Sequence, residues 1–336
     1  MKATLPSRLF TLSRRFMRVL ALAAAISVPF ALASVSAQHY PSRVVTLVVP
    51  FPAGSGTDAV ARVVQPLLAA ELKATVIIEN RPGVNGSIGA AYVSRATADG
   101  YTLLFTTATS HSITPYVSKH VSYDPIRDFT PVGQVGIFPV MLVTSNALPV
   151  RTVPDLIQHV KSHPGLLQYA FGNGTGQVAG AALRTYAGLD IVAVPYRGTP
   201  AAMTDLIAGR INYMFVDATT GLPHVRANSV RGLAVTTLEP SALIPDLPTM
   251  AAAGLPMFNL SAWCGVFGPS RLPNPIVEKL DAALKSVMAS PDLTARLGEM
   301  GFEVSWQSAD DFALFAKADN DRWRMIIRDA HVVQAQ

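Results

Sequence analysis

The stretch from Pro50 to Asp58, PFPAGSGTD, follows an apolar, β-branched run at residues 44–49 and precedes an amphipathic helical pattern. A strand, a glycine-rich turn and a helix start leave several backbone N–H groups unpaired and directed at one point, where the helix dipole is positive. Such a point attracts an anion. No lysine follows the glycines, so the loop lacks the G-K-[ST] sequence of a phosphate-binding P-loop. The stretch therefore favours a small carboxylate over a nucleotide.

Short β-branched runs alternate with helical patterns along most of the chain. Between the first two runs, residues 58–72 place apolar side chains on one helical face, and Pro66 is expected to kink that helix. The alternation predicts an α/β fold with mostly parallel sheets flanked by helices. The strands are expected at residues 43–49, 75–79, 102–106, 134–143, 191–194, 211–216, 231–236 and 263–267.

The last third of the chain is predicted to be helical. Asn274 followed by Pro275 is typical of an N-cap and a first helical residue. Ser308, with Asp311 three residues later, predicts the cap of a final helix. No linker rich in proline or serine separates two independent domains, so we expect two lobes that are joined by crossing strands.

Residues 1–37 have the order of a secretory signal peptide: basic residues, an apolar stretch and the small residues Val35-Ser36-Ala37. A membrane anchor is the alternative, but the apolar stretch is about 15 residues long and contains Pro29, whereas a spanning helix needs roughly 20. We expect export to the periplasm with cleavage after about Ala37. Arg14-Arg15 matches a twin-arginine signal only in part, which favours the general export route.

The charge of the chain changes once this segment is set aside. The whole chain has 27 Lys and Arg and 22 Asp and Glu, but five of the basic residues lie in residues 1–37. The remainder is therefore neutral, and no nucleic-acid partner is predicted. Cys264, the one cysteine of the sequence, lies in an apolar stretch and is expected to be buried rather than reactive.

Four turn regions, each just beyond a predicted strand, are rich in backbone donors and hydroxyl groups and poor in charge. Ligands of open α/β sheets bind at that edge. Each region alone is most simply an ordinary turn, but together they favour a cleft. The regions are PFPAGSGTD, Thr106 to Thr114 (TTATSHSIT), Gly172 to Gln177 (GNGTGQ) and Pro195 to Pro200 (PYRGTP).

Enzymatic functions have less support. The sequence around Ser55, AGSGT, fails the G-x-S-x-G pattern of a nucleophile elbow at both ends. His111, beside Ser110, could donate to a carboxylate or simply pack within its loop. An exported hydrolase that uses Ser55 or Ser110 with His111 stays as the alternative without a complete triad. No cofactor is predicted, and no metal site either, because His120, His159 and His163 have no close cysteine or carboxylate partner at metal-ligand spacing.

Several further motifs, in a fixed order, extend over nearly all of the chain after residue 37. They are YPSR at 40–43, PFPAGSGTD, ENRPG at 79–83, DGYTLL at 99–104, YDPIRDFTPV at 123–132, VPYRG at 194–198, LAVT at 233–236 and PDLPT at 245–249. With these motifs the chain resembles the extracytoplasmic solute receptors of tripartite tricarboxylate transporters, the Bug family of periplasmic binding proteins.

The resemblance implies a receptor without catalysis that closes on a small organic carboxylate and passes it to membrane permease subunits. One lobe would be residues 38–138 plus 260–336 and the other residues 139–259, and the receptor would act as a monomer. A sensor receptor that signals to a membrane kinase is an alternative that the sequence leaves open.

By position, the resemblance also implies a set of ligand contacts. These are Phe51, Ala53, Gly54, Ser55, Gly56, Thr57 and Asp58, then Thr109, Ser110 and His111, then Gly174, Thr175 and Gln177, and finally Tyr196 and Asp217. Several departures from the family pattern bear on ligand identity. Ser55 replaces a common glycine, the acid expected at Val216 appears at Asp217, and the third region has Gly176, Val178 and Ala182 where proline, histidine and glutamate are common. If neither His111 nor Arg197 enters the cleft, a mono- or dicarboxylate is favoured over a tricarboxylate.

Overall fold

The computed structural model describes residues 40–332, and the fold is that of the unit from residue 41 onward. The predicted signal peptide at residues 1–37 lies outside the described residues. Within the described part, no helix combines the length and the apolar character that a membrane crossing requires.

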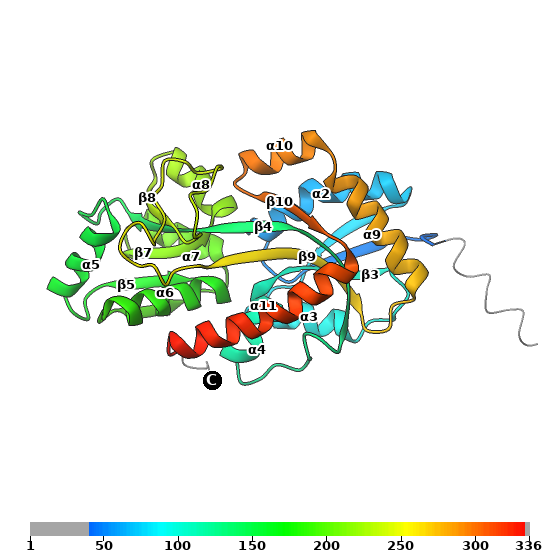
Figure 1. Cartoon of the computed structure of the whole chain (residues 1–336), viewed down its shortest axis with the longest axis horizontal. Coiled ribbons are helices and arrows are strands. Elements are labelled where there is room, and N and C mark those ends of the chain that lie inside the picture. The colour runs from blue at the N-terminus through cyan, green and yellow to red at the C-terminus, as the bar shows by residue number, and fades with distance from the viewer. Residues whose placement is uncertain (1–39, 333–336) are drawn as a thin grey trace, which may run out of the picture. The chain divides into compact units, whose positions relative to one another are not determined.

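In residues 41–332, ten strands are connected in one sheet with the order β2-β1-β3-β9-β4-β7-β5-β6, while β10 and β8 also pair with β4 (Figure 1). The strands are β1 (Val45–Val49), β2 (Val76–Asn80), β3 (Thr102–Thr107), β4 (Phe129–Ser145), β5 (Gln168–Phe171), β6 (Val192–Pro195), β7 (Tyr213–Asp217), β8 (Val230–Val235), β9 (Ser261–Pro269) and β10 (Glu303–Gln307).

The helices flank this sheet. They are α2 (Gly56–Leu72), α3 (Ser87–Ser94), the π-helix η2 (Thr109–Ile113), α4 (Thr114–Val117), α5 (Val153–Ser162), α6 (Gly174–Ala187), α7 (Thr199–Ile207), α8 (Ala218–Arg226), α9 (Asn274–Met288), α10 (Pro291–Glu299) and α11 (Ala309–Asp329).

The 17-residue strand β4 belongs to two halves of the sheet. Its beginning pairs antiparallel with β9 and β10, beside the parallel set β2-β1-β3, which we call the first half. Its end pairs antiparallel with β7 and β8, beside the parallel set β7-β5-β6, which we call the second half. The predicted lobe boundary at 138/139 falls inside β4, and the one at 259/260 falls just before β9.

The predicted α/β fold is confirmed, but the sheet is mixed rather than mostly parallel. The reason is that the chain leaves the first half along β4 and returns along β9, and these two strands run in opposite directions. Each predicted strand is present. Two further strands, β5 and β10, have no clear signal in the sequence, because β5 has only four residues and β10 has half-buried or exposed side chains throughout.

Six helices, α2, α5, α6, α8, α10 and α11, start after a residue whose side chain caps them. Ser55 caps α2 by accepting a hydrogen bond from the Asp58 N–H at 3.4 Å, and Ser308 caps α11 in the same way as predicted. At α9 the expected cap is wrong by one residue, because Asn274 already belongs to the helix and Pro273 precedes it. Pro66 lies inside α2, on its exposed side.

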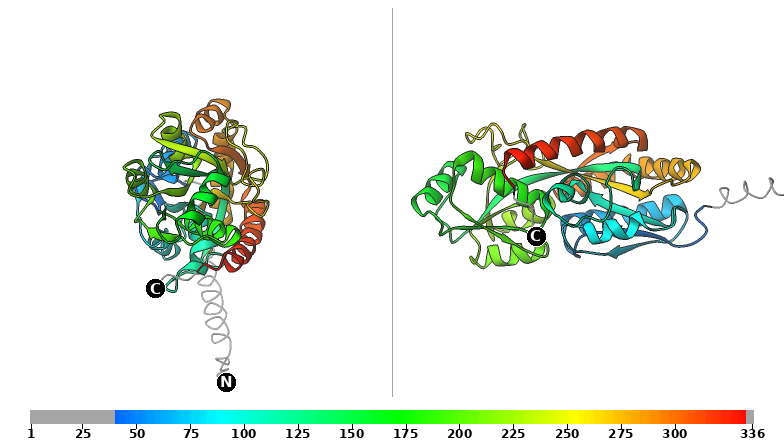
Figure 2. Two further views of the ribbon diagram at one scale, coloured as in Figure 1. Left: turned by 90° about the vertical axis from the view of Figure 1, so that its left-hand side faces the viewer. Right: turned by 90° about the horizontal axis from the view of Figure 1, so that it is seen from below.

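The core of the first half is aromatic. Trp263, Phe267 and Phe312 pack with ring centroids 5.0 to 5.8 Å apart, and Cys264 beside them is fully buried, as predicted. The helix α11 packs on this core and continues to the second half, where the Thr185 hydroxyl of α6 donates to the Ala330 carbonyl at 3.0 Å (Figure 2, right). The final helix therefore contacts both halves.

Candidate functional site

A small cavity of about 30 Å³ lies where loops of the two halves meet. It has room for about two water molecules. From the first half it is lined by Phe51, Pro52, Ser55, Thr57, Thr107 and Thr109, and from the second half by Gly172, Asn173, Thr175, Gly176, Thr199 and the end of β7 at Phe215 to Asp217. The wall is completed by residues of β4 and β9, the two strands that join the halves: Phe138, Val140 and Ala262.

The first turn of α2 opens toward this cavity. The N–H groups of Gly56 and Thr57 donate to no other protein group among the described residues, as expected at a helix start. The Thr57 side chain lines the cavity, is 7% exposed, and makes no hydrogen bond in the described part of the chain. The loop therefore offers two backbone donors, a hydroxyl group and a positive helix end.

Asp58 holds this loop in place instead of facing the cavity. Its carboxylate accepts hydrogen bonds from the Gly54 N–H at 3.0 Å, from Asn80 Nδ2 at 2.8 Å and from Arg62 Nε at 2.9 Å. Burial acts to raise the pKa of Asp58, but these hydrogen bonds and the charge of Arg62 outweigh it, so the pKa lies below its ordinary value. Both carboxylate oxygens are occupied by protein donors, and Asp58 does not line the cavity.

In the second loop, Thr109 lines the cavity, whereas the side chains of Ser110 and His111 do not. The Thr109 and Thr175 hydroxyl groups lie 3.2 Å apart across the cavity wall. Ser110 hydrogen bonds to Thr106 at 2.6 Å and to His111 Nδ1 at 2.9 Å. His111 stacks on Phe267 with ring centroids 4.3 Å apart and is 3% exposed.

Ser110 and His111, two of the predicted ligand contacts, therefore face the core in this structure. Successive residues of the π-helix point in different directions, so Thr109 reaches the cavity while the next two side chains enter the aromatic core. Neither of them lines the cavity. The same placement removes the basis for a hydrolase that uses Ser110 with His111, since both side chains are buried away from any substrate.

The third loop starts α6. Asn173 caps that helix by accepting from the Gly176 N–H at 2.8 Å, and its amide donates to the Thr199 hydroxyl at 3.4 Å. Asn173 and Thr199 were not among the predicted contacts. The sequence signal for Asn173 was its position before a glycine-rich helix start, which is typical of an N-cap.

Asp217 ends β7 and caps α8. Its Oδ1 accepts hydrogen bonds from the N–H and the hydroxyl group of Thr220, both at 2.8 Å. Burial raises the pKa of the Asp217 carboxyl group, because the cavity offers little solvent to its charged form. Among the described residues that line the cavity, Asp217 is the one whose side chain carries a charge.

A second, open groove of about 740 Å³ adjoins the cavity and shares Phe51, Pro52 and Gly172 with it. Gln177 and Tyr196 line this groove rather than the cavity. The Tyr196 hydroxyl donates to Asp205 at 2.7 Å, and burial together with this bond raises the pKa of Tyr196 to about 12.

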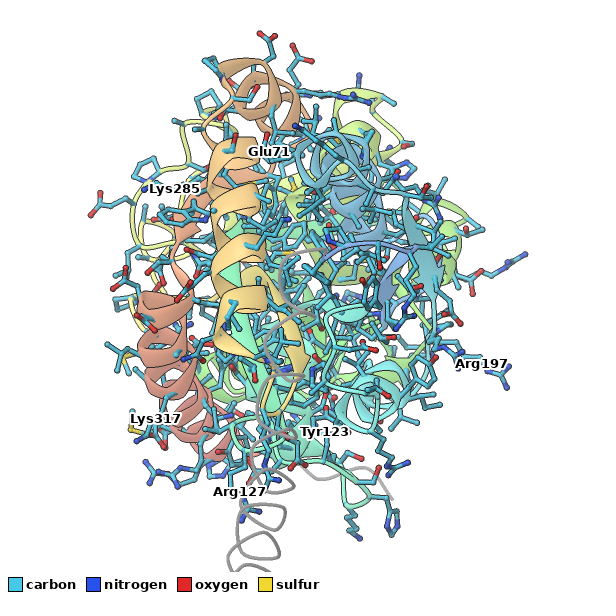
Figure 3. The ribbon with its side chains drawn as sticks, turned by 90° about the vertical axis from the view of Figure 1, so that its right-hand side faces the viewer. Glu71, Tyr123, Arg127, Arg197, Lys285 and Lys317 are labelled. Carbon is cyan, nitrogen blue, oxygen red and sulfur yellow. The ribbon has the colours of Figure 1, made fainter. Side chains whose placement is uncertain are left out.

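Arg197 stands at the rim of the groove and extends away from the molecule (Figure 3). With His111 buried in the core as well, neither of the two cationic candidates reaches the cavity. The remaining predicted contacts, Ala53, Gly54, Gly56 and Gly174, shape the loops without lining either space.

The two halves touch around the cavity. Asn85 Nδ2 donates to Gln177 Oε1 at 3.4 Å, and a Cβ atom added at Gly198 would lie 2.6 Å from the Pro52 ring. Glycine at this position lets the fourth loop approach the first loop closely.

Residues 60–332 match the family described as the tripartite tricarboxylate transporter family receptor, TctC. The chain belongs to this family. It is 30% identical to the protein BugT of Bordetella pertussis over 303 residues, which cover 88% of this chain and 92% of BugT. The predicted resemblance to the Bug receptors is confirmed, and the chain is a solute receptor of the periplasmic binding protein class rather than an enzyme.

Two solved structures show the same fold. Rpa4515 of R. palustris with adipate has a TM-score of 0.86 and 34% identity, and the match covers 88% of this chain and all of that one. MatC of Rhodopseudomonas palustris with bound malate has a TM-score of 0.82 and 31% identity, over 86% of this chain and all of that one. The receptor therefore has the fold of proteins whose structures contain small dicarboxylates.

Proposed function

We propose that this receptor captures a small organic carboxylate in the periplasm and delivers it to the membrane permease subunits of a tripartite transporter. One observation carries the proposal: the first turn of α2 has unpaired N–H groups at Gly56 and Thr57, and Thr57, with its hydroxyl group, lines a cavity between the halves. A carboxylate there would accept from these donors and lie at the positive end of the helix.

The ligand is expected to be a mono- or dicarboxylate rather than a tricarboxylate. No Lys, Arg or His lines the cavity among the described residues, so backbone and hydroxyl donors alone must balance the ligand's charge. The adipate and malate in the two similar structures support this size and charge.

Binding and release are proposed to require separation of the two halves. A cavity of about 30 Å³ is too small to admit a dicarboxylate, which has several times the bulk of a water molecule. Residues 38–138 plus 260–336 would move against residues 139–259, with β4 and β9 as the connections that flex. The mature receptor would begin after about Ala37 and act as a monomer.

The proposal is tested by a thermal-shift and calorimetry screen of mature protein against mono-, di- and tricarboxylates. At a ligand concentration of 100 Kd, the bound receptor gains about 2.7 kcal/mol of stability, which corresponds to a rise in Tm of a few degrees. We expect such a shift with at least one mono- or dicarboxylate and none with sugars or amines. The absence of a shift across aliphatic and aromatic acids would overturn the proposal.

A further inference from the structure

Asp217 lies directly against the first turn of α2. A Cβ atom added at Gly56 would be 2.1 Å from Asp217 Oδ1 and 3.3 Å from Oδ2, so the carboxylate of the second half packs on the Gly56 backbone of the first. This is the same helix start whose free N–H groups form the proposed carboxylate site. Any carboxylate that the loop binds therefore lies close to Asp217.

Only one oxygen of Asp217 is used within the protein. Oδ1 accepts from Thr220 twice, whereas Oδ2 makes no hydrogen bond to another residue in the described part of the chain. Asp217 is partly exposed and lines the cavity. An acceptor oxygen is thus available at a place where no protein cation among the described residues balances it.

A plain carboxylate at this site would meet a like charge in a region that is poor in solvent, which weakens its binding. A carboxylate that carries a hydroxyl or ammonium group on the adjacent carbon would instead donate to Asp217. The unfavourable contact would then be replaced by a hydrogen bond to an ionised acceptor, which is stronger than a bond between neutral groups.

We propose that Asp217 is a specificity-determining residue that selects carboxylates bearing a hydrogen-bond donor beside the bound carboxylate, that is, 2-hydroxy or 2-amino acids. The inference rests on the proposed function and adds to it the chemical class of the ligand. The acceptor is Asp217 Oδ2, and the donors for the ligand's carboxylate are the N–H groups of Gly56 and Thr57.

The test is calorimetry at pH 7.5 with pairs of acids that differ only in the donor: lactate against propionate, malate against succinate, and aspartate against succinate. In the wild-type receptor, we expect the donor-bearing member of at least one pair to bind ten-fold or more tightly. A hydroxyl and an ammonium donor are distinguished by comparing malate with aspartate. Equal affinities within every pair that binds would overturn the inference.

The variant Asp217→Asn removes the charge and keeps an oxygen that can cap α8. We expect it to bind the plain acid more tightly and to reduce the preference to about three-fold or less. Asp155→Asn is the matched control, because Asp155 lies in the first turn of α5 and does not line the cavity, so it should keep the wild-type preference.

An unchanged preference in Asp217→Asn would also overturn the inference. Should Asp217→Asn fail to fold, the affinities of the wild-type receptor for the paired acids test the inference by themselves. If no acid of any kind binds, the proposed function itself fails. If acids bind without a preference for the donor, only the specificity inference fails.

Discussion

His111 is held as a neutral imidazole by its surroundings. Its ring packs between Phe267 and Phe129, with centroids at 4.3 and 4.6 Å, and its Nε2 makes no hydrogen bond within the described residues. Burial lowers the pKa of His111 to about 3. Asp319, a buried carboxylate that bonds to Trp263 of the same core, is already occupied by Ser112, by the Trp263 indole and by Arg322, and no carboxylate bonds to the ring of His111 among the described residues.

This burial predicts a loss of stability in mild acid. The unfolded chain protonates His111 below about pH 6.5, but the folded chain does so only near pH 3. Stability is therefore complete above pH 6.5 and falls as the pH drops, by about 1.4 kcal/mol per pH unit, or about 2 kcal/mol between pH 6.5 and pH 5.

Urea unfolding at pH 7 and pH 5 measures this loss. His111→Phe keeps a ring in the aromatic core and removes the titrating group, so its free energy of unfolding should change about 2 kcal/mol less than that of the wild type. Surface His120 has no comparable burial, and His120→Phe serves as the control. An equal loss in wild type and His111→Phe would show that His111 is not the source.

At the scale of elements, the junction of β1, its loop and α2 depends on Asp58. Its carboxylate joins the Gly54 backbone, the end of β2 through Asn80, and Arg62 one turn along the helix. Replacing it with alanine leaves several donors without an acceptor. We expect Asp58→Ala to lose about 2–4 kcal/mol of unfolding free energy and to weaken carboxylate binding, because the loop is no longer fixed.

Chemical denaturation and calorimetry on the same preparations test this expectation. Asp321→Ala is the matched control, since Asp321 pairs with Arg324 on the surface and such exposed pairs contribute at most about 1 kcal/mol. A loss for Asp58→Ala no greater than that of the control would refute the structural role of this carboxylate.

The same junction shows what the sequence predicts well. Its strand, glycine turn and helix follow from local patterns, and Ser55 is the cap that such a pattern requires. The second loop could not be predicted residue by residue. Whether Thr109 or His111 reaches the cavity depends on the π-helix and on the aromatic core behind it, and neither is a local property of the sequence. For the same reason, the contact between Asn173 and Thr199, which brings the starts of α6 and α7 together at the cavity, could not be predicted.

At the scale of the whole molecule, ligand binding should draw loops from both halves into one protected unit. Hydrogen exchange is expected to slow about 100-fold in residues 50–58 and 172–177 together, at a ligand concentration of 100 Kd. The helix α10 lines neither space and should exchange at an unchanged rate. Protection of residues 50–58 alone would show that the carboxylate binds without engaging the second half.

The α/β class could be predicted from the alternation of patterns and from the family motifs. The mixed character of the sheet could not, because it arises from the pairing of β4 with β9, which lie more than a hundred residues apart in the sequence. Local periodicity shows that a run is a strand but not which partner it takes.

The sharing of β4 between the halves limits how such a receptor can be recombined. Each half contains only part of β4. Along the sequence, the second half follows the start of β4 and ends before β9. A chimaera made with a single crossover would inherit one connecting strand from each parent, and the cross-strand contacts between β4 and β9 would be mismatched. To transfer the specificity of one receptor to another, both connecting strands, β4 and β9, must be exchanged together with the second half, which lies between them in the sequence.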